Sequence, residues 1–282
     1  MKTRVLSGLV YGAAMIFMII KGGLWLLLWM FFVALVGFYE VARATGVLKE
    51  KEKLNLPVAF GFIGLTVYYF LLYMNYDMTY LILTIILTMV AIMAAFVFSF
   101  PKFNGQQIIN CVFALIYAPV TLSFLYTTRE FCSQYDTDRF GIGFFAVWLI
   151  LIAAWFTDMG AYFVGVLIGK HKIAPNLSPK KTIEGCVGGV LIAGLGGFIL
   201  GYIIYAREIL TTIDTRLIFA LLSMCGSICA QVGDLAASGI KRHFGIKDYG
   251  KIIPGHGGVC DRFDSVIFTC PMIYLLTLIF LK

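Results

Sequence analysis

The chain has 282 residues, of which 61% are hydrophobic and 13% charged, and its formal net charge is +7. A soluble domain carries about 25% charged residues, so this composition excludes a soluble globular protein and indicates an integral membrane protein. Basic loops beside an anionic membrane surface account for the positive charge, so no nucleic-acid partner is expected. The seven cysteines form no CxxC pair, which argues against a disulfide framework or a thiolate zinc site.

Apolar runs near the roughly 20 residues needed to cross a bilayer recur along the whole chain. The first is short and follows two basic residues, but no A-x-A-type cleavage site comes after it, so we expect a retained helix rather than a signal peptide. Sustained runs, rather than alternating segments, argue against an outer-membrane barrel. The sequence predicts an all-α polytopic membrane protein with about nine spans (eight to ten), near residues 5–20, 24–45, 57–74, 78–98, 107–128, 143–169, 184–205, 216–240 and 264–281.

The distribution of lysine and arginine predicts the orientation of these spans. With the N-terminus in the cytoplasm, 16 of the 22 basic residues fall in inner segments. Loops 170–183 and 241–263 would then lie on the cytoplasmic side. We therefore expect a multi-pass protein of the cytoplasmic membrane, with its N-terminus inside and its active site at the cytoplasmic face.

Polar residues within the predicted spans divide the chain into two parts. Residues 1–142 hold few, and the exceptions Glu40 and Arg43 are spaced i, i+3, which predicts a local ion pair or a snorkelling arginine. We expect this part to be a scaffold or dimer surface. Residues 143–282 hold almost every other intramembrane charge, and we expect them to carry the catalytic helices.

The seventh predicted span shows small residues at every fourth position. Such a ridge lets helix backbones approach closely in lipid, where packing holds helices together. We expect a structural role for this ridge, which consists of Gly185, Gly189, Ala193, Gly197 and Gly201.

Four carboxylates of the C-terminal part need an explanation, because an intramembrane acid costs several kcal/mol unless it faces a partner, a cavity or a metal. Asp158 could be a satisfied structural acid. Asp261 and Asp264 begin the last helix and could be caps or dipole partners. If these acids converge with Asp234, they repel one another unless some are protonated or divalent cations lie between them. Hard oxygen ligands without a Cys/His cluster favour Mg²⁺ over zinc.

Basic and glycine residues in the same loops suit a polyphosphate. Helical spacing places Asp234, Ser238 and Lys241 on one face. The PGHGG segment is not a Walker A loop, but its backbone can approach an anion closely. A solvated loop remains an alternative for HKIAPNLSPKKT. The pattern suggests an anionic nucleotide meeting an anionic lipid, with basic residues at Lys170, Lys172, Lys180, Lys181, Lys241, Arg242, Lys247, Lys251 and Arg262.

Three motifs give the sequence a resemblance to a known family. They are S-x-I-K-R-x(4)-K-D-x-G-x(2)-I-P-G-H-G-G-V-x-D-R-F-D from Ser238 to Asp264, D-x-x-A-Y-x-x-G-x-x-x-G-K from Asp158 to Lys170, and S-P-K-K-T-x-E-G from Ser178 to Gly185. Together they resemble the phosphatidate cytidylyltransferase, or CDP-diacylglycerol synthase, family. The motifs cover the C-terminal half, whereas the N-terminal half is similar only in hydropathy.

This resemblance implies that CTP and phosphatidate react to give CDP-diacylglycerol and pyrophosphate, with Mg²⁺, a K⁺ ion beside it, and a homodimer. It also implies that Asp234 and Asp261 hold metal. Asp264 and Asp158 are further candidates, and between Asp261 and Asp264 we expect the first to be the ligand and the second the cap. The expected catalytic residues are Asp234, Asp261, Lys241, Arg242 and His256, the histidine as a hydrogen-bonding partner of a phosphate rather than a base. The expected substrate- and phosphate-binding residues are Lys180, Lys181, Ser238, Lys247, Asp248, Gly257, Gly258 and Arg262.

Two other functions remain as alternatives. A CTP-dependent kinase of polyprenol or a similar lipid alcohol would release CDP rather than pyrophosphate. An ion-coupled transporter would place acids near the midplane, often in repeated halves. Here the charges are expected at one membrane face and the two halves do not look alike, which disfavours a transporter.

Overall fold

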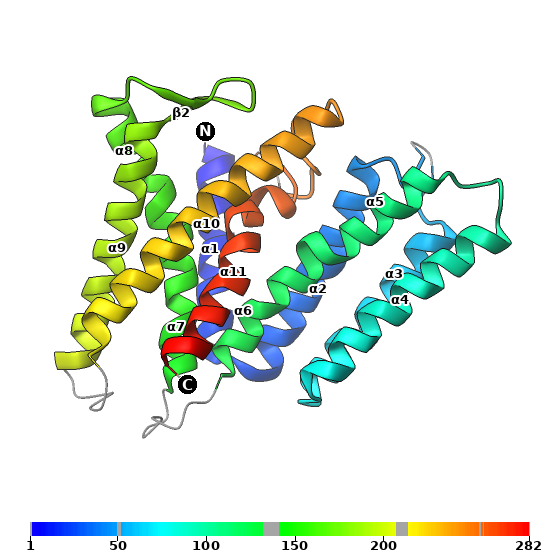
Figure 1. Cartoon of the computed structure of the whole chain (residues 1–282), viewed down its shortest axis with the longest axis horizontal. Coiled ribbons are helices and arrows are strands. Elements are labelled where there is room, and N and C mark those ends of the chain that lie inside the picture. Colours follow the sequence, from blue (N-terminus) through cyan, green and yellow to red (C-terminus); the bar gives the residue numbers. More distant parts are fainter. Residues whose placement is uncertain are drawn as a thin grey trace. The chain divides into compact units, whose positions relative to one another are not determined.

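The computed structural model describes residues 2–49, 52–131, 141–206, 214–253, 255 and 257–281. Within this part the chain is almost entirely helical, with one small hairpin (Figure 1). The elements in chain order are α1 (Lys2–Lys21), α2 (Gly23–Ala44), α3 (Leu56–Tyr73), α4 (Met78–Phe98), α5 (Gly105–Leu115), η1 (Ile116–Val120), α6 (Thr121–Arg129), α7 (Ile142–Leu151), η2 (Ile152–Phe156), α8 (Thr157–Ile168), β1 (Lys172–Ala174), β2 (Ser178–Thr182), α9 (Ile183–Ala206), α10 (Thr215–His243) and α11 (Cys260–Phe280).

These helices confirm the predicted all-α polytopic membrane fold. In the described part of the chain, eight helices are long and apolar enough to cross a membrane, and the apolar part of α1, Val10–Lys21, is shorter. Two spans contain a π-helical turn, η1 and η2. Pro119 lies inside η1, and because proline has no backbone N–H, the local hydrogen-bond pattern has to change there.

The described chain forms two compact units, which we treat separately. Unit 1 comprises Met1–Ser123 and His243–Arg262, and unit 2 comprises Phe124–Arg242 and Phe263–Lys282. The loop 244–259 therefore packs with N-terminal helices. The predicted division into a scaffold part and a catalytic part is a functional one, and it stays a prediction.

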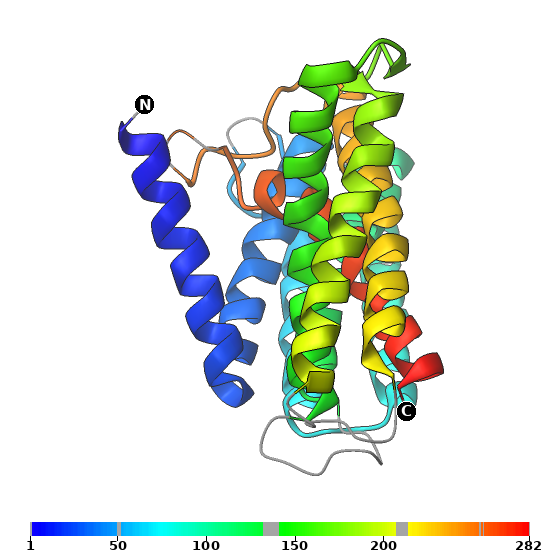
Figure 2. The same ribbon diagram turned by 90° about the vertical axis from the view of Figure 1, so that its left-hand side faces the viewer.

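Unit 1 is built around α2, which packs against α3, α5 and η1, while α3 and α4 lie side by side (Figure 1). Phe38 of α2 is fully buried and meets the Phe62 ring edge-on at a centroid distance of 5.3 Å. The lack of a side chain at Gly61 admits the Phe38 ring, because a Cβ there would overlap it. Between α1 and α2, Gly22 and Gly23 have φ values of 63° and 52°, which glycine adopts readily. Beyond this turn α1 diverges from α2 (Figure 2).

Unit 2 is organised by the small-residue ridge of α9, which lies beside α8 (Figures 1 and 2). A Cβ at Gly189 would meet the carbonyl oxygen of Thr157 on α8, and one at Gly197 would meet that of Phe219 on α10. The ridge therefore lets α9 pack closely on both neighbours, as the sequence predicts. A hydroxyl contact of 2.5 Å from Thr157 Oγ1 to Ser227 Oγ links α8 to α10.

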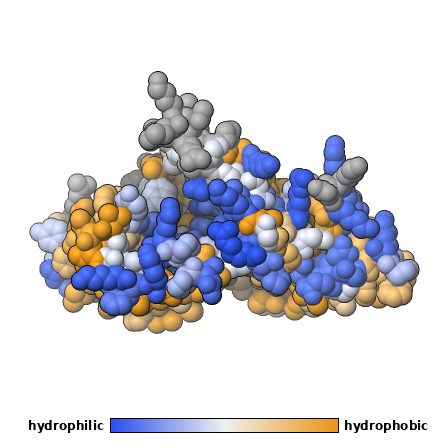
Figure 3. Space-filling view, turned by 90° about the horizontal axis from the view of Figure 1, so that it is seen from above, coloured by the Kyte–Doolittle hydropathy of each residue, from blue (hydrophilic) through white to orange (hydrophobic). Residues whose placement is uncertain are grey.

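The connection between α8 and α9 is an antiparallel hairpin, not the plain loop expected from the sequence. Strands β1 and β2 pair with Lys172 opposite Thr182. The hairpin is fastened at its base by Glu184, whose carboxylate lies 2.5 Å from His171 Nδ1 and accepts the Lys170 amide at 3.1 Å. Figure 3 looks onto this end of unit 2, where hydrophilic side chains gather.

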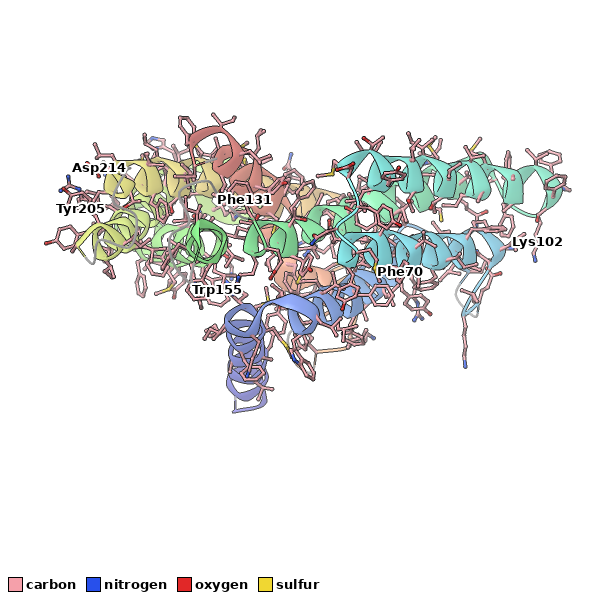
Figure 4. The ribbon with its side chains drawn as sticks, turned by 90° about the horizontal axis from the view of Figure 1, so that it is seen from below. Phe70, Lys102, Phe131, Trp155, Tyr205 and Asp214 are labelled. Atoms are coloured by element: carbon pink, nitrogen blue, oxygen red, sulfur yellow. The ribbon has the colours of Figure 1, made fainter. Side chains whose placement is uncertain are left out.

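An ion pair marks the opposite end of unit 2, between α9 and α10. Arg216 Nη2 lies 2.8 Å from Asp214 Oδ2, and the guanidinium stands 4.2 Å from the centre of the Tyr205 ring. Tyr205 and Asp214 are labelled close together in Figure 4. Among the described residues, this ion pair therefore lies at the start of α10 and contacts the end of α9 through the Tyr205 ring.

Candidate active site

A buried carboxylate on α11 folds the loop 244–259 back onto the start of that helix. Asp261 is 6% exposed, and its Oδ2 accepts hydrogen bonds from the amides of Tyr249, at 2.8 Å, and Gly258, at 2.9 Å. Two amides from different parts of the loop therefore converge on one oxygen. Such charge-assisted bonds are among the stronger hydrogen bonds in proteins, so Asp261 organises the loop whatever else it binds.

A second buried carboxylate, Glu40 on α2, holds the same loop from another side. Glu40 is 3% exposed and accepts hydrogen bonds from the amides of Val259, at 3.1 Å, and Cys260, at 2.9 Å. These are leading amides of α11, whose positive dipole end favours a carboxylate. A Cβ on Gly250 or Gly258 would overlap the Glu40 carboxylate, so the loop backbone is wrapped tightly around it.

The structure contradicts one of two alternatives for Glu40 and Arg43, and it also contradicts the predicted cap of α11. Among the described residues, no ion pair joins Glu40 to Arg43, because the Glu40 carboxylate is bound to backbone amides instead, and the snorkelling arginine stays a prediction. The capping role assigned to Asp264 is filled by Glu40, while Asp264 Oδ1 accepts the amide of its neighbour Ser265 at 2.9 Å. A carboxylate 220 residues away in sequence is not visible as a cap in local patterns.

Two cavities flank the loop segment 247–251 within unit 1. The first, of about 480 Å³, lies against α2 and is here named the α2 cavity; it is lined by Tyr39, Glu40, Arg43, Ile246, Lys247, Asp248, Tyr249, Gly250, Lys251 and Ile252. The second, of about 510 Å³, is named the glycine cavity and is lined by Lys247, Asp248, Gly250, Lys251, Ile253, Gly255, Gly257 and Arg262. Four residues, Lys247, Asp248, Gly250 and Lys251, line both cavities.

The glycine cavity contains several of the predicted phosphate-binding residues. Gly255 and Gly257 have φ values of 78° and 89°, a conformation that favours glycine. The amide of Ile253 donates to the carbonyl of Gly257 at 2.9 Å, which closes the turn between them. His256 lies outside the described residues, so its predicted role stays a prediction.

The other predicted acids belong to unit 2. Asp264 lies within electrostatic range of Asp234, Lys241 and Asp158, so these groups are near one another in unit 2, while their roles stay predictions. The Asp234 carboxylate forms an ion pair with Lys181 of β2, and both side chains are largely covered. Ser238 follows on the same α10 face, and the remaining predicted bases, Lys180 and Arg242, are exposed.

The donor set of unit 2 is compatible with magnesium. Within the described ranges, no group of three or more His, Cys, Asp or Glu side chains is arranged to hold a metal ion. Mg²⁺ is commonly bound by only one or two carboxylates together with water and substrate phosphates, so three protein ligands are not required. Asp158 and Asp234 each lie nine or ten residues before the end of their helix, roughly 15 Å along its axis. A cation bound there would be recessed from the hairpin end.

Comparison with known proteins identifies the family. The sequence model described as the cytidylyltransferase family matches residues 2–280. The chain belongs to this family. Relatives named phosphatidate cytidylyltransferase include one from Staphylococcus saprophyticus (30% identical over 277 residues, 98% of each chain), one from Staphylococcus epidermidis (32% over 283 residues, 98% of each) and one from Bacillus subtilis (31% over 294 residues, 99% of this chain and 98% of the relative).

In this cytidylyltransferase family member, an N-terminal helix lines the α2 cavity with residues to which the sequence interpretation gave no site role. Glu40, Arg43 and Tyr39 all lie on α2, within the part predicted to be a scaffold or dimer surface. The sequence interpretation also gave no role to Tyr249, whose amide donates a hydrogen bond to Asp261. Burial raises the pKa of the Tyr249 phenol, so its hydroxyl stays protonated. The one available signal was the presence of an acid, Glu40, within an apolar span.

Proposed function

We propose that the protein is a phosphatidate cytidylyltransferase, which transfers CMP from CTP to phosphatidate and so makes CDP-diacylglycerol for phospholipid biosynthesis. The observation that carries this proposal is the likeness to curated phosphatidate cytidylyltransferases over 98% or more of this chain. The two cavities beside the loop 244–259 support it, because each is lined by lysine or arginine side chains suited to phosphate groups.

The reaction needs little proton transfer. A phosphatidate oxygen attacks the α-phosphorus of CTP, a new P–O bond forms, and the bond to the bridging oxygen breaks as pyrophosphate leaves. Because the lipid phosphate is already ionised near neutral pH, no general base is required. The main task is to bring two polyanions together in line, which positioned cations accomplish. We assign this task to Lys241, Arg242, Lys247 and Arg262.

Magnesium is the proposed cofactor, with K⁺ as a second ion. Asp234 and Asp261 are its proposed ligands, and Asp158 and Asp264 are supporting candidates. All four offer the hard oxygen donors that Mg²⁺ prefers. When bound, the ion would neutralise charge on the CTP phosphates and on the leaving pyrophosphate.

We further propose that the protein lies in the cytoplasmic membrane with its N-terminus and its active site on the cytoplasmic side. The bias of lysine and arginine toward the segments on that side supports this orientation. A homodimer is also proposed, with residues 1–142 supplying its surface and residues 143–282 the catalytic helices.

The decisive experiment incubates purified protein with α-phosphate-labelled CTP and phosphatidate, with Mg²⁺ or with excess chelator. Labelled CDP-diacylglycerol and unlabelled pyrophosphate should form only with Mg²⁺. Absence of a CDP-lipid would overturn the proposal, and release of CDP with a polyprenol acceptor would favour the lipid-alcohol kinase.

The metal ligands are tested separately with Asp234→Asn and Asp261→Asn. We expect each variant to lose at least about tenfold in turnover, comparable with the loss of a supporting partner in other metal sites. Lys53→Met, an exposed charge change in the α2–α3 connection, serves as the control and should keep wild-type turnover. Near-full Mg²⁺-dependent turnover in either aspartate variant would rule out that ligand.

A further inference from the structure

We propose that the α2 cavity binds the phosphomonoester headgroup of the lipid substrate, with Arg43 as its main ligand, while the glycine cavity takes the phosphates of the nucleotide. This inference rests on the proposed function and assigns each substrate to its own side of the segment 247–251. It gives α2 a direct role in substrate binding.

The position of the α2 cavity favours a lipid. Tyr39, Glu40 and Arg43 lie in the last turns of α2, a helix long and apolar enough to cross the membrane. The end of such a helix lies at the depth of the lipid headgroups. A phosphate attached to a diacylglycerol can therefore reach Arg43 while its acyl chains remain in the bilayer. The cavity wall also includes apolar Ile246 and Ile252, the second of which is 54% exposed.

The charge of the α2 cavity favours a phosphomonoester. Arg43, Lys247 and Lys251 contribute three positive charges, against the carboxylates of Asp248 and Glu40. In the part of the chain that the structure describes, Glu40 accepts the amides of Val259 and Cys260 and forms no ion pair with Arg43. Among the described residues, none of the three bases forms an ion pair. A guanidinium presents a planar fork of donors that matches two phosphate oxygens.

The glycine cavity differs in the way expected for a polyphosphate. It lacks the two tyrosines of the α2 cavity and has Gly255 and Gly257 beside Ile253 in its wall, where backbone can approach an anion closely, and it adds the cation Arg262. Because Lys247, Asp248, Gly250 and Lys251 line both cavities, the two cavities adjoin along this segment. An in-line attack requires the lipid phosphate and the α-phosphorus to meet at the edge where the cavities adjoin.

The test compares Arg43→Gln and Arg43→Lys with Lys49→Gln as the matched control. Lys49 is an exposed base just after α2, outside both cavities, so its loss removes the same surface charge. In mixed micelles, Arg43→Gln should raise the KM for dioctanoyl phosphatidate about tenfold or more, as expected for a lost charge-assisted contact, and leave the KM for CTP within about twofold. Arg43→Lys should lie between, and Lys49→Gln should match the wild type.

A binding measurement keeps the inference testable without turnover. Dioctanoyl phosphatidate should raise the unfolding temperature of the wild type and of Lys49→Gln but not of Arg43→Gln, whereas CTP with Mg²⁺ should stabilise all three. If Arg43→Gln unfolds early without ligand, Arg43→Lys supplies the comparison.

An unchanged KM for phosphatidate, or an equal rise for both substrates, would overturn the assignment of the α2 cavity. The converse variant Arg262→Gln should raise the KM for CTP selectively, and a selective effect on phosphatidate would contradict the division. Failure of the wild type to form CDP-diacylglycerol would instead reject the proposed function, while the binding measurement would still decide whether Arg43 holds a lipid phosphate.

Discussion

The carboxylate of Glu40 on α2 accepts a 2.9 Å hydrogen bond from the amide of Cys260, the first residue of α11. Through this bond an N-terminal membrane helix holds the loop 244–259. The neighbouring amide of Val259 binds the same side chain. The loop 244–259 is therefore held by two buried acids: Glu40, which belongs to α2, and Asp261, which follows the loop at the start of α11.

Replacement of Glu40 by glutamine should disturb the loop although the two side chains have the same shape. The carboxylate binds two N–H groups, and in glutamine one acceptor oxygen becomes an NH₂ group that faces an amide donor. We expect a loss of about 1–3 kcal/mol in unfolding free energy and at least a tenfold loss in turnover. Chemical unfolding and kinetics measure the two effects. Glu52→Gln, in the α2–α3 connection, is the control and should change neither.

Replacement of Gly258 by alanine should also disturb the packing between the loop and Glu40, this time from the loop side. The new Cβ would overlap the Glu40 carboxylate, so either the loop or the acid must move. We expect a clear fall in turnover, with a loss of unfolding free energy of about 1–3 kcal/mol from overpacking. Gly105→Ala meets no atom within 4 Å and serves as the matched control. Wild-type kinetics for Gly258→Ala would mean that close packing of the loop 244–259 around Glu40 is not needed for catalysis.

Lys181→Met should separate function from stability in unit 2. The Lys181–Asp234 pair is partly exposed, with 20% and 26% of the two side chains accessible, and such pairs contribute only about 0–1 kcal/mol. We therefore expect an unfolding temperature close to that of the wild type but at least a tenfold loss in kcat/KM for CTP. Lys53→Met, an exposed lysine in the α2–α3 connection, should retain activity. Unchanged kinetics for Lys181→Met would assign the pair to structure alone.

The ion pair of Asp214 and Arg216 should affect stability in a pH-dependent way and leave catalysis unchanged. Hydrogen bonds from the Arg216 side chain hold the pKa of Asp214 below its usual value of about 3.9. The contribution of the pair is therefore present above that usual value and is lost as pH falls through the lower, folded pKa. The unfolding temperature of Arg216→Gln should fall below that of the wild type at pH 7, and the difference should shrink as the pH falls below about 3.9.

The same variant should keep wild-type kinetics at pH 7. Asp214 precedes Asp234 by 20 residues on or beside a continuous helix, which corresponds to roughly 30 Å. A drop in turnover without loss of fold would contradict the assignment of this end of unit 2 to stability.

The fold was largely predictable because it depends on local composition. Apolar run length placed the spans, and four-residue spacing at Gly189 and Gly197 correctly predicted the close packing of α9. The hairpin escaped notice because its strands are only three and five residues long, with a mostly exposed pattern and Pro179 within β2. Such short strands carry no recognisable alternation.

The candidate site was predictable only where its residues lie close in sequence or belong to the resembling motifs. The grouping of Asp234, Lys241 and Asp264 was expected from helical spacing and motif content. The role of Glu40 was not, because its partners are 219 and 220 residues away. Helix α11 begins at Cys260, four residues earlier than expected. The distant residue Glu40 explains this difference too, because it accepts the amides of Val259 and Cys260 and so caps the helix at this earlier start.

The long separation between Glu40 and Cys260 also bears on how the protein is made. At about 5–20 residues per second, a ribosome needs roughly 10–45 s to synthesise the 220 residues between them. During this interval the Glu40 carboxylate lacks both of its amide partners, although α2 has already emerged. Membrane insertion of α2 and final assembly of the loop are therefore separate events in biogenesis, and a chain interrupted before α11 cannot form the contact between Glu40 and Cys260.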